Sequence, residues 1–302
     1  MGMDTMGGFA YEAPTTLDAA LALLAEKAQA QQRTQLLAGG TDMLVQMRSL
    51  DPEPRCIVDV KRVPETAEIR VDAGGLVLGS AVTAATITRH ADIVARWPGL
   101  VEAIDLIGST QIQGRASPGG NLCTASPAGD SIPIMIADGG VAQVASASGR
   151  REVPVEQFVT GVQRNCLEPG EMLVAIAFPD PGERSGDAYL RFIPRTEMDI
   201  AVASAGVRVS VDGDGRITAA RVGIGAVAPT ALLVPAAADA LVGTTGDDAA
   251  MAALAEACSA AANPISDKRG TADYRRRIVG VLARRAATRA LARARGEEGV
   301  DA

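Results

Sequence analysis

The stretch Arg115-Ala-Ser-Pro-Gly-Gly-Asn-Leu-Cys-Thr-Ala-Ser-Pro-Ala-Gly-Asp130 is the part of this 302-residue sequence that most narrows the fold. Two adjacent glycines, Gly119 and Gly120, precede Asn121 and a run of small polar side chains that ends in a carboxylate. Glycine has no Cβ atom, so such peptides can bring their N–H groups within contact distance of an anion. The surrounding residues 109–138 are rich in Gly, Pro and Ser, and we expect a long functional loop there. A rigid loop without a ligand is the alternative.

A second glycine pair lies upstream, in Leu36-Leu-Ala-Gly-Gly-Thr-Asp-Met43. A short apolar strand over residues 35–38 ends in this pair, and a hydroxyl and a carboxylate follow. A plain tight turn would explain this pattern by itself. Two such loops 80 residues apart, at 39 and 119, instead suggest one extended anion held from two sides. Neither loop has the G-x-G-x-x-G dinucleotide pattern or a P-loop, so a nucleotide would need a different fold.

The rest of the chain alternates helical and strand patterns. A helix is predicted over residues 17–25, after a hydroxyl N-cap at Thr15-Thr16. A hairpin is predicted over 69–79, with its turn at Gly74-Gly75. Further strands are expected at 56–60, 141–145, 151–155, 171–178, 201–211 and 217–227, with alanine-rich helices towards the end of the chain.

These patterns predict an α+β protein with two domains. Residues 1–178 are expected to form a two-part α/β domain, with subdomains of about 1–60 and 61–178. Residues 179–302 are expected to form a smaller α+β domain with an antiparallel sheet and helices, since Pro179-Asp-Pro-Gly-Glu-Arg-Ser-Gly186 is typical of a boundary.

Composition excludes several classes of protein. The net charge of −7 argues against a nucleic-acid or anionic-membrane partner, and no run of 18 apolar residues occurs. His90 is the only histidine, which removes histidine triads and multi-histidine metal sites. The four cysteines include no C-x-x-C pair and so give no basis for a metal or iron–sulfur site. Scattered thiols and the lack of a leader-like segment indicate a cytoplasmic protein.

Beyond these patterns, the chain resembles the FAD-binding (medium) subunits of molybdenum hydroxylases, the xanthine dehydrogenase, aldehyde oxidoreductase and carbon monoxide dehydrogenase group. The resemblance spans nearly the whole chain. It rests on the 38–42 loop, on the block at 119–127, and on Tyr189-Leu-Arg-Phe-Ile-Pro-Arg-Thr-Glu-Met-Asp-Ile-Ala201. It implies an FAD-binding domain of the PCMH type.

The resemblance also implies which residues contact FAD. The two glycine loops would wrap the pyrophosphate, while Leu173 and the segment near Arg191 would border the flavin. Pro118 stands where the family usually has Ile, Val or Leu, and Arg191 stands where some relatives have lysine. No catalytic residue or metal ligand is implied in this chain. The implied cofactor-binding residues are Leu36, Leu37, Ala38, Gly39, Gly40, Thr41, Asp42, Met43, Ser117, Pro118, Gly119, Gly120, Asn121, Asp130, Leu173 and Arg191.

The implied function is electron transfer within a complex. A large subunit would hold the molybdenum cofactor and a small subunit two-iron two-sulfur clusters, in a heterotrimer that could pair into a dimer of heterotrimers. FAD in this chain would pass their electrons to an external acceptor. One alternative is a self-sufficient flavin oxidase or reductase of the same fold, for which one histidine and three tyrosines supply few acid–base groups. Another is a flavin-binding scaffold without electron transfer.

Two further patterns leave their interpretation open. Arg195 and Asp199 are spaced for an ion pair, which is either structural or a direct influence on the flavin. The helix predicted over residues 274–295 holds eight arginines. It is either an amphipathic helix with a solvated basic face or a docking surface for an acidic partner subunit.

Overall fold

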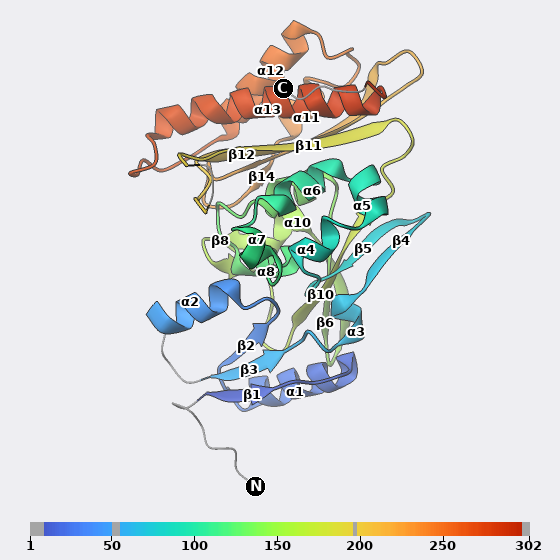
Figure 1. The fold of residues 1–302 in the computed structure, drawn as a ribbon. Helices are drawn as coiled ribbons and strands as arrows, with labels where there is room; N and C mark the ends of the chain where they lie inside the picture. Colours follow the sequence, from blue (N-terminus) through green and yellow to red (C-terminus); the bar gives the residue numbers. More distant parts are fainter. Residues whose placement is uncertain (1–8, 50–54, 196–197, 298–302) are drawn as a thin grey trace.

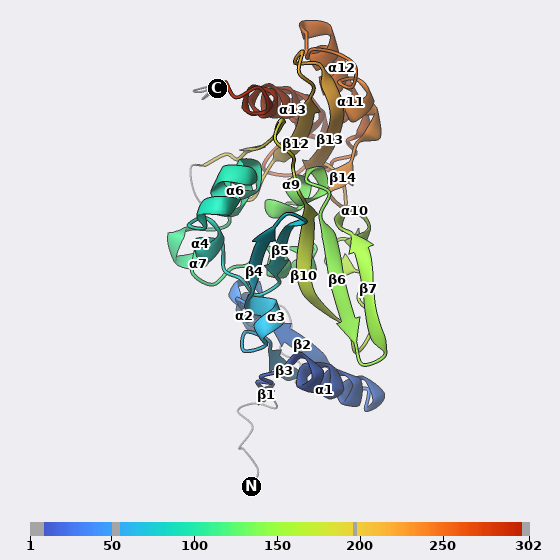
Figure 2. The same ribbon diagram turned by 90° about the vertical axis from the view of Figure 1, so that its right-hand side faces the viewer.

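The fold consists of three units that follow one another along the chain, each with its own sheet and hydrophobic core (Figure 1). The structure, a computed structural model, describes residues 9–49, 55–195 and 198–297. Figure 2 shows the central sheet lying between the N-terminal unit and the C-terminal unit. The predicted α+β class, with an antiparallel sheet in the C-terminal part, is confirmed.

The N-terminal unit is a small parallel sheet in the order β1-β3-β2, packed on one helix. That helix begins where predicted, because the Thr16 hydroxyl accepts the Ala19 N–H at 3.2 Å. It buries Leu17, Leu21 and Leu24 against the sheet. The elements are β1 (Ala10–Glu12), α1 (Leu17–Gln29), β2 (Thr34–Leu37), α2 (Thr41–Ser49) and β3 (Cys56–Asp59).

The central unit contains an antiparallel sheet in the order β4-β5-β10-β6-β7. The predicted hairpin at its edge is confirmed: Gly75 has φ +122°, and a Cβ atom there would lie 2.0 Å from the Phe178 carbonyl oxygen. The strands are β4 (Ile69–Asp72), β5 (Gly75–Gly79), β6 (Val141–Ser146), β7 (Gly149–Pro154), β8 (Val159–Gly161), β9 (Arg164–Asn165) and β10 (Met172–Pro179). The first helices are α3 (Pro64–Ala67), α4 (Ala84–Ile87), α5 (Ala91–Arg96) and α6 (Pro98–Asp105).

The prediction of one long loop over residues 109–138 was wrong. The segment forms three short helices, α7 (Thr110–Gln113), α8 (Pro118–Thr124) and α9 (Ser131–Ala137), and α10 (Val155–Phe158) lies after β7. Pro118 occupies the first turn of α8, where its missing N–H costs nothing. Every residue of α9 is buried, so no polar face marks it as a helix in the sequence.

The C-terminal unit packs its helices on one face of an antiparallel sheet, in the order β11-β12-β13-β14 (Figure 1). The other face of this sheet packs on α9 of the central unit. The two lie so close that a Cβ atom at Gly223 of the sheet would be 2.1 Å from the carbonyl oxygen of Pro133 in α9. The elements are β11 (Ser185–Phe192), β12 (Ala203–Val211), β13 (Ile217–Gly225), β14 (Leu232–Leu233), α11 (Pro235–Asp239), α12 (Asp248–Ala261) and α13 (Ala272–Ala294).

The arginines of α13 fall into two sets: Arg277, Arg284 and Arg285 are exposed, as a solvated basic face requires, while three others are engaged within the protein. Arg275 is buried, and its guanidinium donates to the carbonyl oxygens of Val202 and Ala226. Arg289 and Arg293 both bind Glu102 of α6. Arg289 and Arg293 therefore join the C-terminal unit to the central unit, while Arg275 supplies donors to buried carbonyl groups within the C-terminal unit. Within the part of the chain described, no helix has the length and apolar character needed to span a membrane.

Candidate functional site

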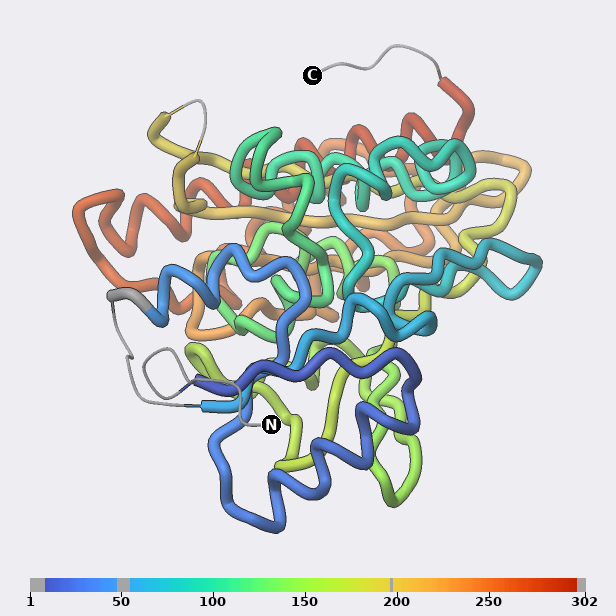
Figure 3. Tube along the Cα trace, turned by 60° about the horizontal axis from the view of Figure 1, so that its bottom comes forward, coloured from blue at the N-terminus to red at the C-terminus, as the bar shows by residue number. Residues whose placement is uncertain are grey.

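A cleft of about 1350 Å³ runs between the N-terminal and central units. Figure 3 brings the N-terminal unit towards the viewer and shows it lying against the segments that follow it. The loop after β2, the first turns of α2 and α8, and the segment from Glu168 to Leu173 all line the cleft. The two glycine pairs, distant in sequence, therefore meet at one cavity.

The first wall of the cleft is the Gly39-Gly40 loop and the helix that follows it. Gly40 has φ +80°, a left-handed conformation that favours glycine. The chain then enters α2, whose first turn leaves the backbone N–H groups of Thr41, Asp42 and Met43 without intrahelical acceptors, as any helix start does. These groups and the positive end of the helix dipole lie at the cleft.

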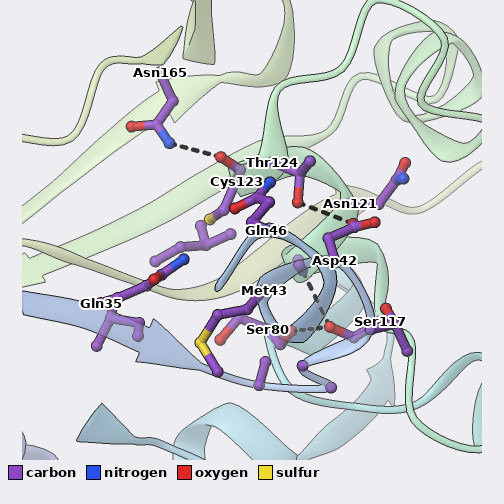
Figure 4. A pocket seen from close by; sticks show the side chains of 18 of the residues that line it. Gln35, Asp42, Met43, Gln46, Ser80, Ser117, Asn121, Cys123, Thr124 and Asn165 are labelled. Atoms are coloured by element: carbon purple, nitrogen blue, oxygen red, sulfur yellow. Dashed lines mark hydrogen bonds between the residues drawn. The ribbon is translucent and has the colours of Figure 1, made fainter. Parts of the chain in front are cut away.

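The second wall is the start of α8. The Ser117 hydroxyl caps this helix by accepting the Gly120 N–H at 3.0 Å, and it donates to the Ser80 carbonyl oxygen at 2.8 Å (Figure 4). Gly119 lies directly on that residue: a Cβ atom there would be 2.4 Å from the Ser80 carbonyl oxygen. The cap and the close approach fix the first turn of α8 against the end of β5.

The two walls contact each other. A Cβ atom on Gly39 would lie 2.0 Å from the Arg115 carbonyl oxygen, so only glycine allows this approach. The Arg115 Nε donates to the Gly39 carbonyl oxygen at 3.4 Å. Farther along, the Thr124 hydroxyl donates to the Asp42 carboxylate at 3.1 Å and joins α8 to α2 (Figure 4). Gly39 and Gly119 therefore serve contacts within the protein, while Gly120 meets only Ser117 Oγ, at 3.1 Å.

The donors around the cleft suit a diphosphate held by neutral groups. Backbone N–H groups at the start of α2, and that of Gly119 at the start of α8, are accompanied by the hydroxyls of Thr41 and Ser126 and by amide side chains. On an acidic chain, this is the expected way to bind an anion. The cleft volume exceeds the roughly 300–1,000 Å³ of common small-ligand pockets, which suits an extended ligand of dinucleotide size.

At one end of the cleft, the Asp130 carboxylate lies against two side chains of β11. Arg191 Nη1 donates to Asp130 Oδ2 at 2.8 Å, and the Tyr189 hydroxyl donates to Oδ1 at 3.3 Å. Burial raises the pKa of the Asp130 carboxyl, and the Arg191 guanidinium opposes that rise. Burial also raises the pKa of the Tyr189 hydroxyl well above its usual value, so this group remains a hydrogen-bond donor.

Thirteen of the sixteen residues expected at the cofactor site line the cleft. The other three do not line it. Leu37 and Pro118 are sequence neighbours of lining residues, and Arg191 is connected to the cleft only through its hydrogen bond to Asp130. Arg195 and Asp199 form the expected ion pair at 3.1 Å, and Asp199 is itself at the cleft. Sequence reasoning did not identify several lining residues whose signals are weak, among them Gln35, Ser80, Thr124, Asn165 and Ile200.

Cysteine and acidic side chains show no sign of a metal centre in the described ranges. No group of three or more His, Cys, Asp or Glu residues there could hold a metal ion. All four cysteines are free thiols, and burial raises the pKa of Cys123, which lines the cleft, to about 12. A thiol with so high a pKa is a poor nucleophile and a poor ligand at neutral pH.

Comparison with known proteins gives a consistent result. Residues 7–181 match the family described as FAD binding domain in molybdopterin dehydrogenase. Residues 188–290 match the CO dehydrogenase flavoprotein C-terminal domain. The chain is 33% identical to the carbon monoxide dehydrogenase medium chain of Afipia carboxidovorans, over 96% of this chain and 99% of that protein.

Two further comparisons agree. The chain is 30% identical to a xanthine dehydrogenase FAD-binding subunit of Escherichia coli O157:H7, over 95% of this chain and 97% of the relative. The fold is similar to a chain in the crystal structure of a Cu,Mo-CO dehydrogenase, with a TM-score of 0.88 at 31% identity. That likeness covers 94% of this chain and 98% of the other.

Proposed function

The chain belongs to the family of FAD-binding subunits of molybdopterin dehydrogenases, and on this premise we propose that the cleft between its N-terminal and central units holds FAD. It is an oxidoreductase subunit that transfers electrons within a molybdenum hydroxylase complex. The observation that carries the proposed site is the meeting of the starts of α2 and α8 at one cleft, with two glycine pairs between them.

Different residues along the cleft would contact different parts of FAD. We propose that the pyrophosphate is bound by the backbone N–H groups at the start of α2, by that of Gly119 at the start of α8, and by the Thr41 hydroxyl. Asp130 and Leu173 would border the flavin end of the cleft. Leu173 would exclude water on one side, and Asp130 would present a carboxylate on the other. Bound FAD would supply the redox chemistry, since its ring system can exchange one or two electrons. The full set of proposed FAD contacts comprises Leu36, Ala38, Gly39, Gly40, Thr41, Asp42, Met43, Ser117, Gly119, Gly120, Asn121, Asp130 and Leu173.

Our proposal extends to the partner subunits. The relatives are named as chains or subunits of dehydrogenases, and this chain has no metal-ligand cluster among its described residues. We propose that a molybdenum-cofactor subunit and an iron–sulfur subunit supply electrons, and that this chain delivers them to an external acceptor. Four free thiols suit a reducing compartment, so we place the complex in the cytoplasm.

Flavin analysis and reconstitution test the proposal. The full chain, purified with its co-expressed partners, should release one FAD per chain, and substrate should bleach the flavin absorbance of the complex. The chain alone should turn over no purine, aldehyde or heteroaromatic substrate. Release of FMN, or a complex without flavin, would refute the cofactor assignment. Substrate-driven bleaching in the isolated chain would instead support a self-sufficient flavoenzyme.

A matched pair of glycine variants tests the location. Gly40→Val should abolish FAD retention, because φ +80° disfavours valine and its Cβ atom would lie 2.8 Å from the Leu37 side chain. Gly213→Val is the control, since a Cβ atom there meets nothing within 4 Å. Equal FAD content in the two variants would place the cofactor elsewhere.

A further inference from the structure

Asp130 has an unusual role for an acidic residue at the start of a helix. It occupies the N-cap position of α9, where an aspartate carboxylate ordinarily accepts an N–H from the helix's first turn. The Asp130 carboxylate makes no such bond. Both of its oxygens are instead engaged by β11 of the C-terminal unit, while the residue lines the cleft. Its orientation is therefore set from outside the FAD-binding unit.

The two residues that engage Asp130 come from one face of one strand. Tyr189 and Arg191 are two positions apart on β11, so their side chains point to the same side of the sheet. The Tyr189 side chain is buried, and its backbone N–H donates to the Glu102 carboxylate at 2.9 Å. Glu102 is held in turn by Arg289 and Arg293 of α13. The strand is thus anchored where it meets the cleft.

We propose that Arg191 and Tyr189 are positioning residues for the cofactor site, holding the Asp130 carboxylate in a fixed orientation in the wall of the cleft. The inference rests on the proposed function, since it assumes that the cleft holds FAD. It assigns Arg191 an effect on the flavin that passes through Asp130, in place of a direct contact. By this route, the C-terminal unit would complete the electrostatic environment of the cleft.

Burial and charge support an indirect role for Arg191. Its side chain is only 4% exposed and is not among those lining the cleft, while Asp130 is 13% exposed and does line it. Arg191 Nε is buried and has no hydrogen-bond partner among the described residues, so Nη1 makes the connection to Asp130. Removing Arg191 would leave a buried carboxylate without its cation, a state that favours protonation.

A double-mutant cycle on FAD binding tests the proposal. We would prepare the full chain as wild type, Arg191→Gln, Asp130→Asn and the double variant, and measure the FAD dissociation constant and the flavin midpoint potential of each. Alone, Arg191→Gln should weaken FAD binding by about tenfold or more, the scale of a lost charge-assisted hydrogen bond. In the Asp130→Asn background, the same substitution should change the dissociation constant by less than about twofold. Its shift of the midpoint potential should likewise be much smaller in that background.

The pH dependence provides a readout that a purely structural role would not change. In Arg191→Gln, FAD affinity should fall as the pH is lowered, because Asp130 then protonates more readily than in the wild type. The Asp130→Asn variants have no carboxylate to titrate and should lack this dependence. Arg191→Lys, which keeps the cation, should recover part of the affinity. Tyr189→Phe, which removes only the hydroxyl, should weaken FAD binding less than Arg191→Gln.

A neighbouring arginine serves as the matched control. Arg195 is 71% exposed and pairs with Asp199, so Arg195→Gln should leave the dissociation constant within about twofold in both backgrounds. Additive effects of the Arg191 and Asp130 substitutions would overturn the inference, because they would indicate a direct contact of Arg191 with FAD. A wild-type chain that binds no FAD, alone or in its complex, would overturn the proposed function and this inference with it.

Discussion

The unfolding free energy of this protein should fall as the pH rises from 6 to 8, because of one carboxyl between the central and C-terminal units. Asp187 of β11 is fully buried, and its Oδ2 accepts the Leu100 N–H at the start of α6 at 3.3 Å. Asp138 lies beside it, and the Arg208 guanidinium serves both carboxyls, at 2.9 Å from Asp138 and 3.7 Å from Asp187. Arg293 Nη1 donates to the Asp187 carbonyl oxygen. Two buried acids thus share one close cation.

The size of the effect follows from the protonation of this pair. Burial, with the nearby Asp138 carboxyl, raises the pKa of Asp187 to about 8. A carboxyl whose pKa is higher in the folded than in the unfolded state stabilises the fold fully below the unfolded pKa of about 4. That stability is lost as the pH rises towards the folded pKa, by roughly 2 kcal/mol between pH 6 and pH 8. The loss should level off above about pH 8.

Urea unfolding at several pH values measures this loss. Trp97, the only tryptophan, is fully buried at the start of α6, so its fluorescence reports on this region. Asp187→Asn mimics the protonated carboxyl and should remove the decline between pH 6 and pH 8. Asp214→Asn, at an exposed turn, makes the same change of charge and should follow the wild type. If Asp187→Asn and the wild type lose stability in parallel, a buried proton at Asp187 is not the cause.

Three further substitutions, two of them with matched controls, should lower the stability of the protein. Gly39→Ala should cost roughly 1–3 kcal/mol and lower the FAD content, since its Cβ atom would lie 2.0 Å from the Arg115 carbonyl oxygen. Gly120→Ala, whose Cβ atom would meet only Ser117 Oγ at 3.1 Å, is the control in thermal unfolding. Gly280→Ala should cost a similar amount, because its Cβ atom would lie 2.7 Å from the Ala255 carbonyl oxygen where α13 crosses α12; an unchanged urea midpoint would contradict this packing. Arg293→Glu should lower the urea midpoint, because Arg293 binds Glu102 between units, while Arg284→Glu, in an exposed pair with Asp248, should not. Equal midpoints for these two variants would show that the contact between α13 and α6 adds nothing.

Local signals in the sequence were sufficient for much of the fold. The Thr16 cap of α1, the hairpin turn at Gly75 and the tight turn between β12 and β13 each depend on residues close together in the chain. The glycine pairs at 39 and 119 likewise predicted an anion site before any geometry was known. Helix caps and tight turns are local interactions, so a short stretch of sequence is enough to specify them.

Tertiary structure alone decided how these parts meet. Helix α9 is buried on every side, and it is held between the central unit and β12 and β13, so its sequence shows no amphipathic period. The partner of Asp130 is Arg191, which lies 61 residues away along the chain, and neither side chain shows this pairing by its type or spacing. The arginines of α13 appear in sequence as a basic surface, yet Arg275 is buried. Burial and long-range pairing depend on which surfaces pack together, and no single segment of the sequence contains that information.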